Sequence, residues 1–214
     1  MKNVFTYRLR AFAGDTNGAT LTELAIIIPV LLLLVFGAVE FGRFGYNETV
    51  AQKAMDIAAR TAAVRPAVCA GVPDTYQPPS SSAGNPPRFG TLCRMDANAC
   101  AAVPEASCLL SEVPGNATAE EIWSTIAPLV PSGATPANIR IRYTFDDTLG
   151  FLGGPYTPIV TAEFENFNYQ FITPLGALAG VAGSGSTNAI GNTIVFPSMS
   201  ASLPAEDLNA GIGG

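Results

Sequence analysis

Residues 18–39 read GATLTELAIIIPVLLLLVFGAV, and this stretch decides the fold. Between Glu23 and Glu40 it carries no charge over residues 24–39. A helix over that run spans roughly 24 Å, slightly less than the ~30 Å hydrocarbon core of a bilayer, and flanking residues can extend it. Four consecutive leucines at 31–34 leave no polar face for water, which disfavours the alternative of a buried helix in a soluble core. The stretch predicts one membrane-inserted helix, with the span at about residues 21–42.

Charges around the helix predict its orientation. Lys2, Arg8 and Arg10 precede it, and no acidic residue comes before Asp15. Positive residues stay cytoplasmic, so we expect the N-terminus inside and the bulk of the chain exported. No small-x-small cleavage site follows the apolar run, as it would in an ordinary secretory signal. The remaining place for a cut lies before the run, between residues 18 and 19.

A cut at that place gives a recognisable layout. A basic leader ends in Gly18, Glu23 becomes the fifth residue of the mature chain, and an apolar helix follows. This layout resembles the class III signal peptides of prepilins. Together with Pro29, Gly37 and residues 40–43 (EFGR), it resembles the TadE-like family of minor pilins and pseudopilins in tight-adherence (Flp) pilus systems. The resemblance covers residues 18–66, and residues 169–176 (YQFITPLG) resemble the C-terminal part of family members. Leu24 departs from the family, whose members often have Phe there.

The resemblance implies specific roles for residues of the helix. It implies cleavage by a prepilin peptidase between Gly18 and Ala19, with Glu23 part of the processing site. It also implies assembly into an Flp-type pilus through Ala19, Glu23 and Pro29, with the Glu23 carboxylate neutralising the Ala19 amine of a neighbouring subunit. The alternatives are an interfacial carboxylate that reaches the headgroups and a proline kink without a further role.

The resemblance also implies partners and a location. The partners are the lipid bilayer, the prepilin peptidase, the inner-membrane assembly platform, and other minor pilins or the major pilin. The chain is expected as a single-pass inner-membrane protein with a cytoplasmic N-terminus and a periplasmic C-terminal domain. After assembly it would lie in the extracellular pilus.

Composition excludes several classes of function. The 214 residues carry a net charge of −6, which argues against nucleic acid as a partner. The chain has no histidine, so histidine bases, ligands and triads are excluded. We predict no cofactor, no metal site and no enzymatic activity. Glu163 and Glu165 could act as an acid–base pair, but their spacing is also that of an exposed sheet face. Two functional alternatives remain, a pseudopilin of a general secretion system and a signal-anchored periplasmic ligand-binding domain.

Four cysteines, Cys69, Cys93, Cys100 and Cys108, lie on the exported side. Their spacing contains no C-x-x-C pair, which disfavours zinc, and an oxidising compartment favours two disulfides. Three pairings are open to four cysteines. We prefer Cys69–Cys93 with Cys100–Cys108.

The remaining pattern predicts an α+β fold. We expect a leader at 1–18, one long helix over 19–65 stopped by Pro66, a disulfide-stapled loop region at 66–116 and an α+β exported domain at 117–214. The second half of the helix has a seam of small and apolar residues, and we expect it to pack on a small antiparallel sheet, as in pilins. Packing on neighbouring helices is the alternative.

Local patterns place the elements of the exported domain. We expect a helix over 119–130 capped by Thr118, and a short apolar helix over 175–181. Three strands are expected at 139–146, 158–172 and 192–203. The second strand changes phase near Glu165, which predicts a β-bulge, and Pro197 places the third strand at an edge.

Overall fold

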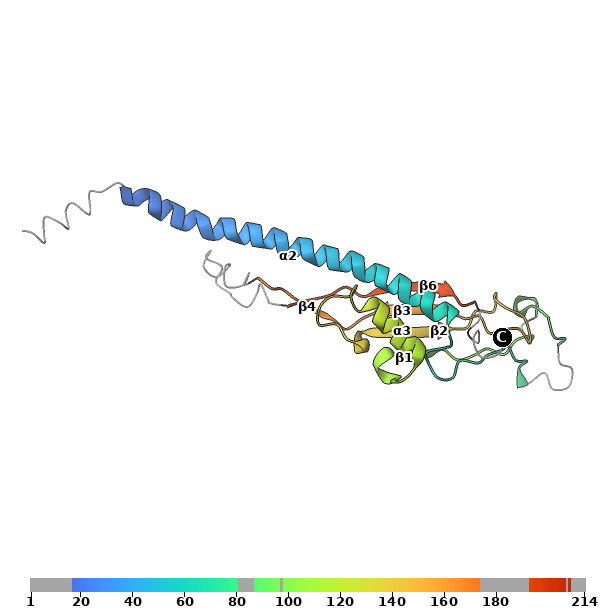
Figure 1. The fold of residues 1–214 in the computed structure, drawn as a ribbon. Helices are drawn as coiled ribbons and strands as arrows, with labels where there is room; N and C mark the ends of the chain where they lie inside the picture. Colours follow the sequence, from blue (N-terminus) through green and yellow to red (C-terminus); the bar gives the residue numbers. More distant parts are fainter. Residues whose placement is uncertain (1–16, 81–86, 97, 174–192, 207, 209–214) are drawn as a thin grey trace, which may run out of the picture. The chain divides into compact units, whose positions relative to one another are not determined.

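The computed structural model describes residues 17–80, 87–96, 98–173, 193–206 and 208 (Figure 1). The chain divides into two compact units. The first comprises residues 1–44 and 170–194, and the second comprises residues 45–169 and 195–214. The expected helix at 175–181 falls outside the described residues.

A single helix, α2 (Asn17–Val64), contributes to both units. It continues through Pro29 and ends two residues before Pro66, as predicted. Within the described residues, α2 is the one helix long and apolar enough to cross a membrane. Its most apolar 18-residue window has a mean hydropathy of 2.7, and only 6% of that window is buried within the protein. In the first unit, α2 therefore presents an apolar surface that the chain itself does not cover.

The second unit is built on a four-stranded antiparallel sheet. Its strands are β1 (Ala106–Leu109), β2 (Ile139–Thr144), β3 (Ile159–Phe164) and β6 (Met199–Pro204), in the order β1-β2-β3-β6. Strands β2 and β3 alternate between buried and half-buried residues, which is the pattern of a sheet with one covered face. The part of α2 that belongs to this unit runs along the sheet in Figure 1. The predicted α+β fold is confirmed.

The helix seam is confirmed from residue 51 onward. Ala51, Met55, Ala58 and Ala62 are all completely buried. Small side chains let the helix backbone approach the sheet closely, and the larger residues of β2 and β3 fill the remaining space. A backbone hydrogen bond also joins the end of α2 to the chain after β6: the Glu206 amide donates to the Ala63 carbonyl at 3.0 Å. Packing on its own domain, rather than on other helices, accounts for this half of the seam.

The number of strands was predicted wrongly. Strand β1 lies in the region expected to be an irregular loop, and only one of its four residues, Cys108, is buried. The expected strand over 158–172 is divided into β3 and β4 (Asn168–Gln170), with Asn166 between them in a left-handed conformation (φ 55°). The predicted phase change is real, but it separates two strands of different sheets, because β4 pairs with β5 (Thr193–Val195). Pro197, which has no amide hydrogen to donate, lies between β5 and β6.

The helix α3 (Ala117–Ile126) starts earlier and ends sooner than predicted. Its N-cap is Asn116, whose side-chain oxygen accepts from the Ala119 amide at 2.9 Å. Thr118, the predicted cap, is buried, and its hydroxyl donates to the Pro66 carbonyl at 3.0 Å. A tertiary contact with the end of α2 therefore takes the side chain that the local pattern assigned to capping. The described residues also contain the short 3-10 turns η2 (Cys93–Met95), η3 (Leu110–Glu112) and η4 (Pro136–Asn138).

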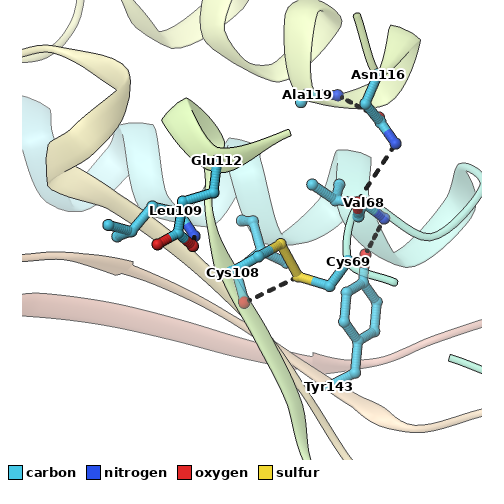
Figure 2. The surroundings of a disulfide bond; sticks show 9 residues. Val68, Cys69, Cys108, Leu109, Glu112, Asn116, Ala119 and Tyr143 are labelled. Atoms are coloured by element: carbon cyan, nitrogen blue, oxygen red, sulfur yellow. Dashed lines mark hydrogen bonds between the residues drawn. A yellow bond between two sulfur atoms is a disulfide. The ribbon is translucent and has the colours of Figure 1, made fainter. Parts of the chain in front are cut away.

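The preferred disulfide pairing was also wrong. The bonds are Cys69–Cys108, with Cα atoms 5.6 Å apart, and Cys93–Cys100, with Cα atoms 5.2 Å apart. Cys108 lies on β1 directly opposite Ile141 of β2, and Cys69 Sγ is 3.4 Å from the Ile141 carbonyl oxygen (Figure 2). The pairing thus depends on strand register, which cysteine spacing does not contain.

Polar contacts fix the turn after α2, next to the Cys69–Cys108 disulfide. The Tyr143 hydroxyl accepts from the Val68 amide at 3.0 Å, and Asn116 Nδ2 donates to the Val68 carbonyl at 3.3 Å (Figure 2). Burial raises the pKa of Tyr143 to about 12, and the hydrogen bond from Val68 opposes that shift. The turn after α2 is therefore fixed to both β2 and the start of α3.

Candidate assembly site

The N-terminal residues singled out in the sequence lie on α2. Gly18 and Ala19 belong to its first turn, and Pro29 is half-buried. Glu23 is exposed, and its carboxylate has no hydrogen-bond or ion-pair partner among the described residues. A carboxylate at the edge of an apolar segment is costly in a membrane unless another group pairs with it. Processing at Gly18 and pairing of Glu23 stay predictions.

The apolar run that follows Glu23 is exposed over most of its length. Large side chains on several sides of the helix are uncovered, with Ile26 73%, Leu34 63% and Ile27 59% exposed. A surface helix of a soluble domain would have one covered apolar face and one polar face. This run has neither, and by length and composition it could cross a membrane.

A buried carboxylate, Glu40, closes the run. Its Oε1 accepts hydrogen bonds from two successive backbone amides, Ile172 at 3.1 Å and Thr173 at 2.8 Å. The Arg43 guanidinium, one helical turn on, lies 3.7 Å from the same oxygen. Hydrogen bonds from backbone amides to an ionised carboxylate are stronger than those between neutral groups. Glu40 therefore holds the chain at Ile172 and Thr173 against α2 within the first unit.

Aromatic and polar contacts continue this attachment. The rings of Phe41 and Phe171 pack edge to face in the first unit, with centroids 5.9 Å apart. In the second unit, Asn47 Nδ2 donates to the Tyr169 hydroxyl at 3.2 Å. The two stretches that carried the sequence resemblance, 40–43 and 169–176, thus contact each other through their described residues. Sequence reasoning noted both stretches and missed this contact. The sequence signal that could have indicated this contact was Glu40, a carboxylate at the end of a run that otherwise lacks charge.

Two buried oxygens at this attachment are unsatisfied. Among the residues that the structure describes, Glu40 Oε2 and Thr173 Oγ1 have no hydrogen-bond partner. A buried polar atom without a partner costs about 1–3 kcal/mol. A water molecule or a donor from another chain would be stabilised there.

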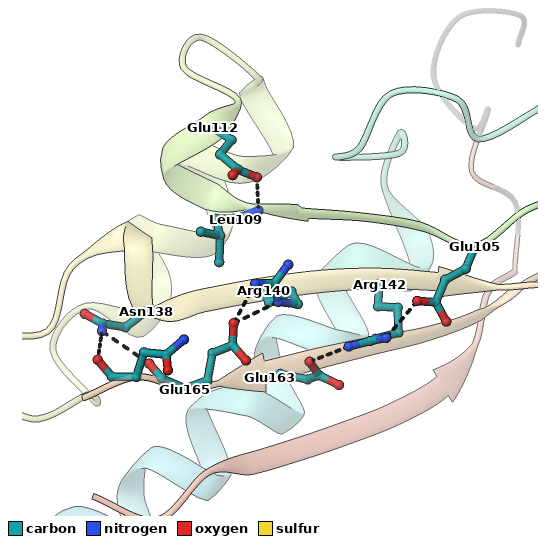
Figure 3. Close-up of polar contacts among 9 residues, drawn as sticks. Glu105, Leu109, Glu112, Asn138, Arg140, Arg142, Glu163 and Glu165 are labelled. Atoms are coloured by element: carbon teal, nitrogen blue, oxygen red, sulfur yellow. Dashed lines mark hydrogen bonds and ion pairs between the residues drawn. The ribbon is translucent and has the colours of Figure 1, made fainter. Parts of the chain in front are cut away.

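The carboxylates considered for acid–base chemistry are ion-paired on the outer face of the sheet (Figure 3). Arg140 Nη2 lies 2.7 Å from Glu165 Oε1. Arg142 lies between two carboxylates, 3.1 Å from Glu163 and 2.7 Å from Glu105. The hydrogen bond and the charge of Glu163 raise the pKa of Arg142 further above its usual value. Such a ladder of alternating charges stabilises cross-strand pairing, and it engages Glu105, Glu163 and Glu165 with arginines.

The described part of the chain contains no group of three or more carboxylate or cysteine side chains arranged to hold a metal ion. Two shallow hollows lie beside each other near the start of β6. One is about 350 Å³ and is lined by Glu48, Gln52 and Pro197 among others. The other is about 220 Å³ and includes Glu163 and Glu165. Ser198 and Met199 line both.

Comparison with known proteins supports one relationship. No curated protein and no solved structure matches the chain. The family model described as "TadE-like protein" matches residues 18–60. That range begins at the predicted cleavage site, includes the exposed apolar run and Glu40, and extends into the buried seam of α2. The chain is therefore identified as TadE-like over this segment.

Proposed function

We propose that the chain is a minor pilin or pseudopilin of a tight-adherence (Flp) type IV pilus. A TadE-like segment associates a protein with this pilus system in general terms, and the family is structural rather than catalytic. The finer role proposed is cleavage by a prepilin peptidase after Gly18 and entry into the pilus through the exposed part of α2.

One observation carries this proposal. The helix exposes an apolar surface, preceded by a carboxylate, Glu23, that has no partner among the described residues. A soluble domain gains nothing from such a segment, whereas a membrane or a bundle of like helices covers it. Cleavage at the predicted site would give Ala19 a new positive amine, and Glu23 of an adjacent chain would neutralise it.

The test is the variant Glu23→Gln in cells that assemble the pilus. We expect normal export and both disulfides, but at least a tenfold loss of the chain from sheared pilus fractions, because the neutral amide no longer balances the neighbouring amine. The matched control is Glu120→Gln, which removes an exposed carboxylate from α3 and should leave incorporation unchanged. Equal incorporation of the two variants would refute the proposed role of Glu23.

A further inference from the structure

The second unit exposes an apolar patch on its loops. Phe89 is 80% exposed, Met95 73%, Phe151 43% and Leu92 39%. These residues come from two loops that are bonded to each other, because Gly90 donates to the Leu152 carbonyl at 2.9 Å and Leu152 donates to the Thr91 carbonyl at 2.9 Å. We call Phe89, Leu92, Met95 and Phe151, with Arg88 and Arg94, the tip.

The tip is held in place by its backbone. The Cys93–Cys100 disulfide closes one loop, and Leu92 and Phe151 form a β-bridge between the two loops. Phe89 lies against Gly153, where a Cβ atom would come within 2.4 Å of the Phe89 ring. Gly153 also has a φ of 82°, which favours glycine. The exposed rings are therefore presented by an ordered surface.

The tip carries two arginines in an acidic protein, beside one exposed carboxylate, Asp96, whose oxygen accepts from the Asn98 amide at 2.8 Å. Arg88 and Arg94 are both exposed, and within the described residues neither guanidinium has an ion-pair or hydrogen-bond partner. The chain as a whole has a net charge of −6. An apolar patch flanked by two unpaired arginines suits an acidic surface with apolar residues at its centre.

The chain carries such a surface at the opposite end of the same unit. Glu48 is exposed and unpaired among the described residues, and it lines the larger hollow with Pro197 and Met199. The adjoining hollow adds Glu163 and Glu165, each with one oxygen bound to an arginine of β2. We call these two hollows the acidic hollow.

Strand register establishes that the two surfaces lie at opposite ends. Phe164 pairs with Met199 at one end of the sheet, and Ile159 pairs with Pro204 at the other. The acidic hollow lies at the Met199 end, where Gln52 Nε2 donates to the Ser200 carbonyl at 3.2 Å. The tip includes Phe151, from the connection between β2 and β3 at the Ile159 end. Copies of the second unit can therefore stack in one direction.

We propose that the tip of one copy of this chain docks into the acidic hollow of a second copy. Phe89 and Met95 would contact Pro197 and Ser198, which are both exposed, while Arg88 and Arg94 would approach Glu48. This contact joins different surfaces of two copies, so it repeats along a line rather than closing a dimer. It is independent of leader cleavage and of Glu23, and so can fail or hold separately from the proposed function.

The test is photo-crosslinking of the full chain purified in detergent micelles, where a shared bilayer does not hold all copies at one height, with p-benzoylphenylalanine replacing Phe89. We expect covalent dimers whose crosslinked peptide contains Glu48 or residues 197–199. The same probe replacing Ser124, an exposed residue of α3, is the control and should give no dimer. An adduct only to detergent or to another tip, or no adduct, would overturn the proposal.

Charge reversal gives a second arm. Arg88→Glu with Arg94→Glu should lower the dimer yield about fivefold, since exposed charges near an interface contribute modestly. Adding Glu48→Arg should restore at least half of the lost yield. All of these residues are exposed, so formation of both disulfides should be unchanged and serves as the folding control. Charge-reversed chains that crosslink as well as the parent, or that Glu48→Arg does not rescue, would contradict the pairing.

Discussion

The two halves of α2 differ in exposure and in the size of their side chains. Residues 24–39 are mostly large, branched and exposed, and in the half from residue 51 onward Ala51, Ala58 and Ala62 are completely buried. Large aliphatic groups suit a fluid or multi-chain environment, while alanine lets a helix approach a sheet closely. One continuous helix thus carries a segment for surroundings outside the chain and a segment for its own domain.

The largest loss of stability should come from opening the Cys69–Cys108 disulfide, which attaches the chain just after α2 to strand β1. Cys69→Ala with Cys108→Ala opens a connection between residues 39 apart, and the chain-entropy model gives a loss of about 4 kcal/mol in unfolding free energy. Cys93→Ala with Cys100→Ala opens a connection of only 7 residues and should cost about 2.5 kcal/mol. Denaturant titration of the full chain in detergent micelles measures both. The reverse order would contradict the structure.

Alkaline pH should weaken the packing of Tyr143 against the turn after α2. Because burial raises the folded-state pKa of Tyr143 to about 12, the folded state favours the neutral phenol. Its contribution is present below pH 10 and is lost as pH rises through 12, which amounts to about 3 kcal/mol in unfolding free energy. Tyr143→Phe should start less stable, since the Val68 amide loses its acceptor, but should lose less stability between pH 9 and pH 11.5. Equal pH slopes for the two proteins would contradict this account.

A matched pair of alanines compares the two halves directly. Ala58→Leu adds a branched side chain to a completely buried position and should lower the unfolding free energy by about 1–3 kcal/mol. Ala38→Leu makes the same change at an exposed position of the apolar half and should change it by less than about 0.5 kcal/mol. Thermal unfolding in micelles measures both variants. Similar losses from both would remove the distinction between the halves.

The smallest effect should be local, at the attachment closing the apolar half. Glu40→Ala removes the acceptor for the Ile172 and Thr173 amides, so hydrogen exchange at these amides should accelerate roughly tenfold to thirtyfold. Glu40→Gln keeps an acceptor oxygen and should have a smaller effect. Unchanged exchange in Glu40→Ala would show that the carboxylate does not hold the segment.

Local patterns predicted the elements whose signals are local. Charge and hydropathy predicted α2, Pro66 predicted its end, and the alternation around Ile141 predicted β2. The candidate residues Gly18, Ala19 and Glu23 also came from a contiguous motif.

Other features depend on contacts between distant residues, and no local pattern contains them. Cys108 pairs with Cys69 because β1 lies beside β2, and Thr118 bonds to Pro66 rather than capping α3. The buried role of Glu40 requires a segment 132 residues further along the chain. The break at Asn166 is a single left-handed residue, which alternation alone could not distinguish from a bulge.

The central claim is that the apolar half of α2 becomes the N-terminus of an assembling subunit. N-terminal sequencing of the protein purified from membranes of pilus-producing cells tests this claim most directly. We predict a chain that begins at Ala19, and a Gly18→Leu variant that keeps its leader. A wild-type chain that retains Met1, or one that begins beyond residue 39, would contradict the account.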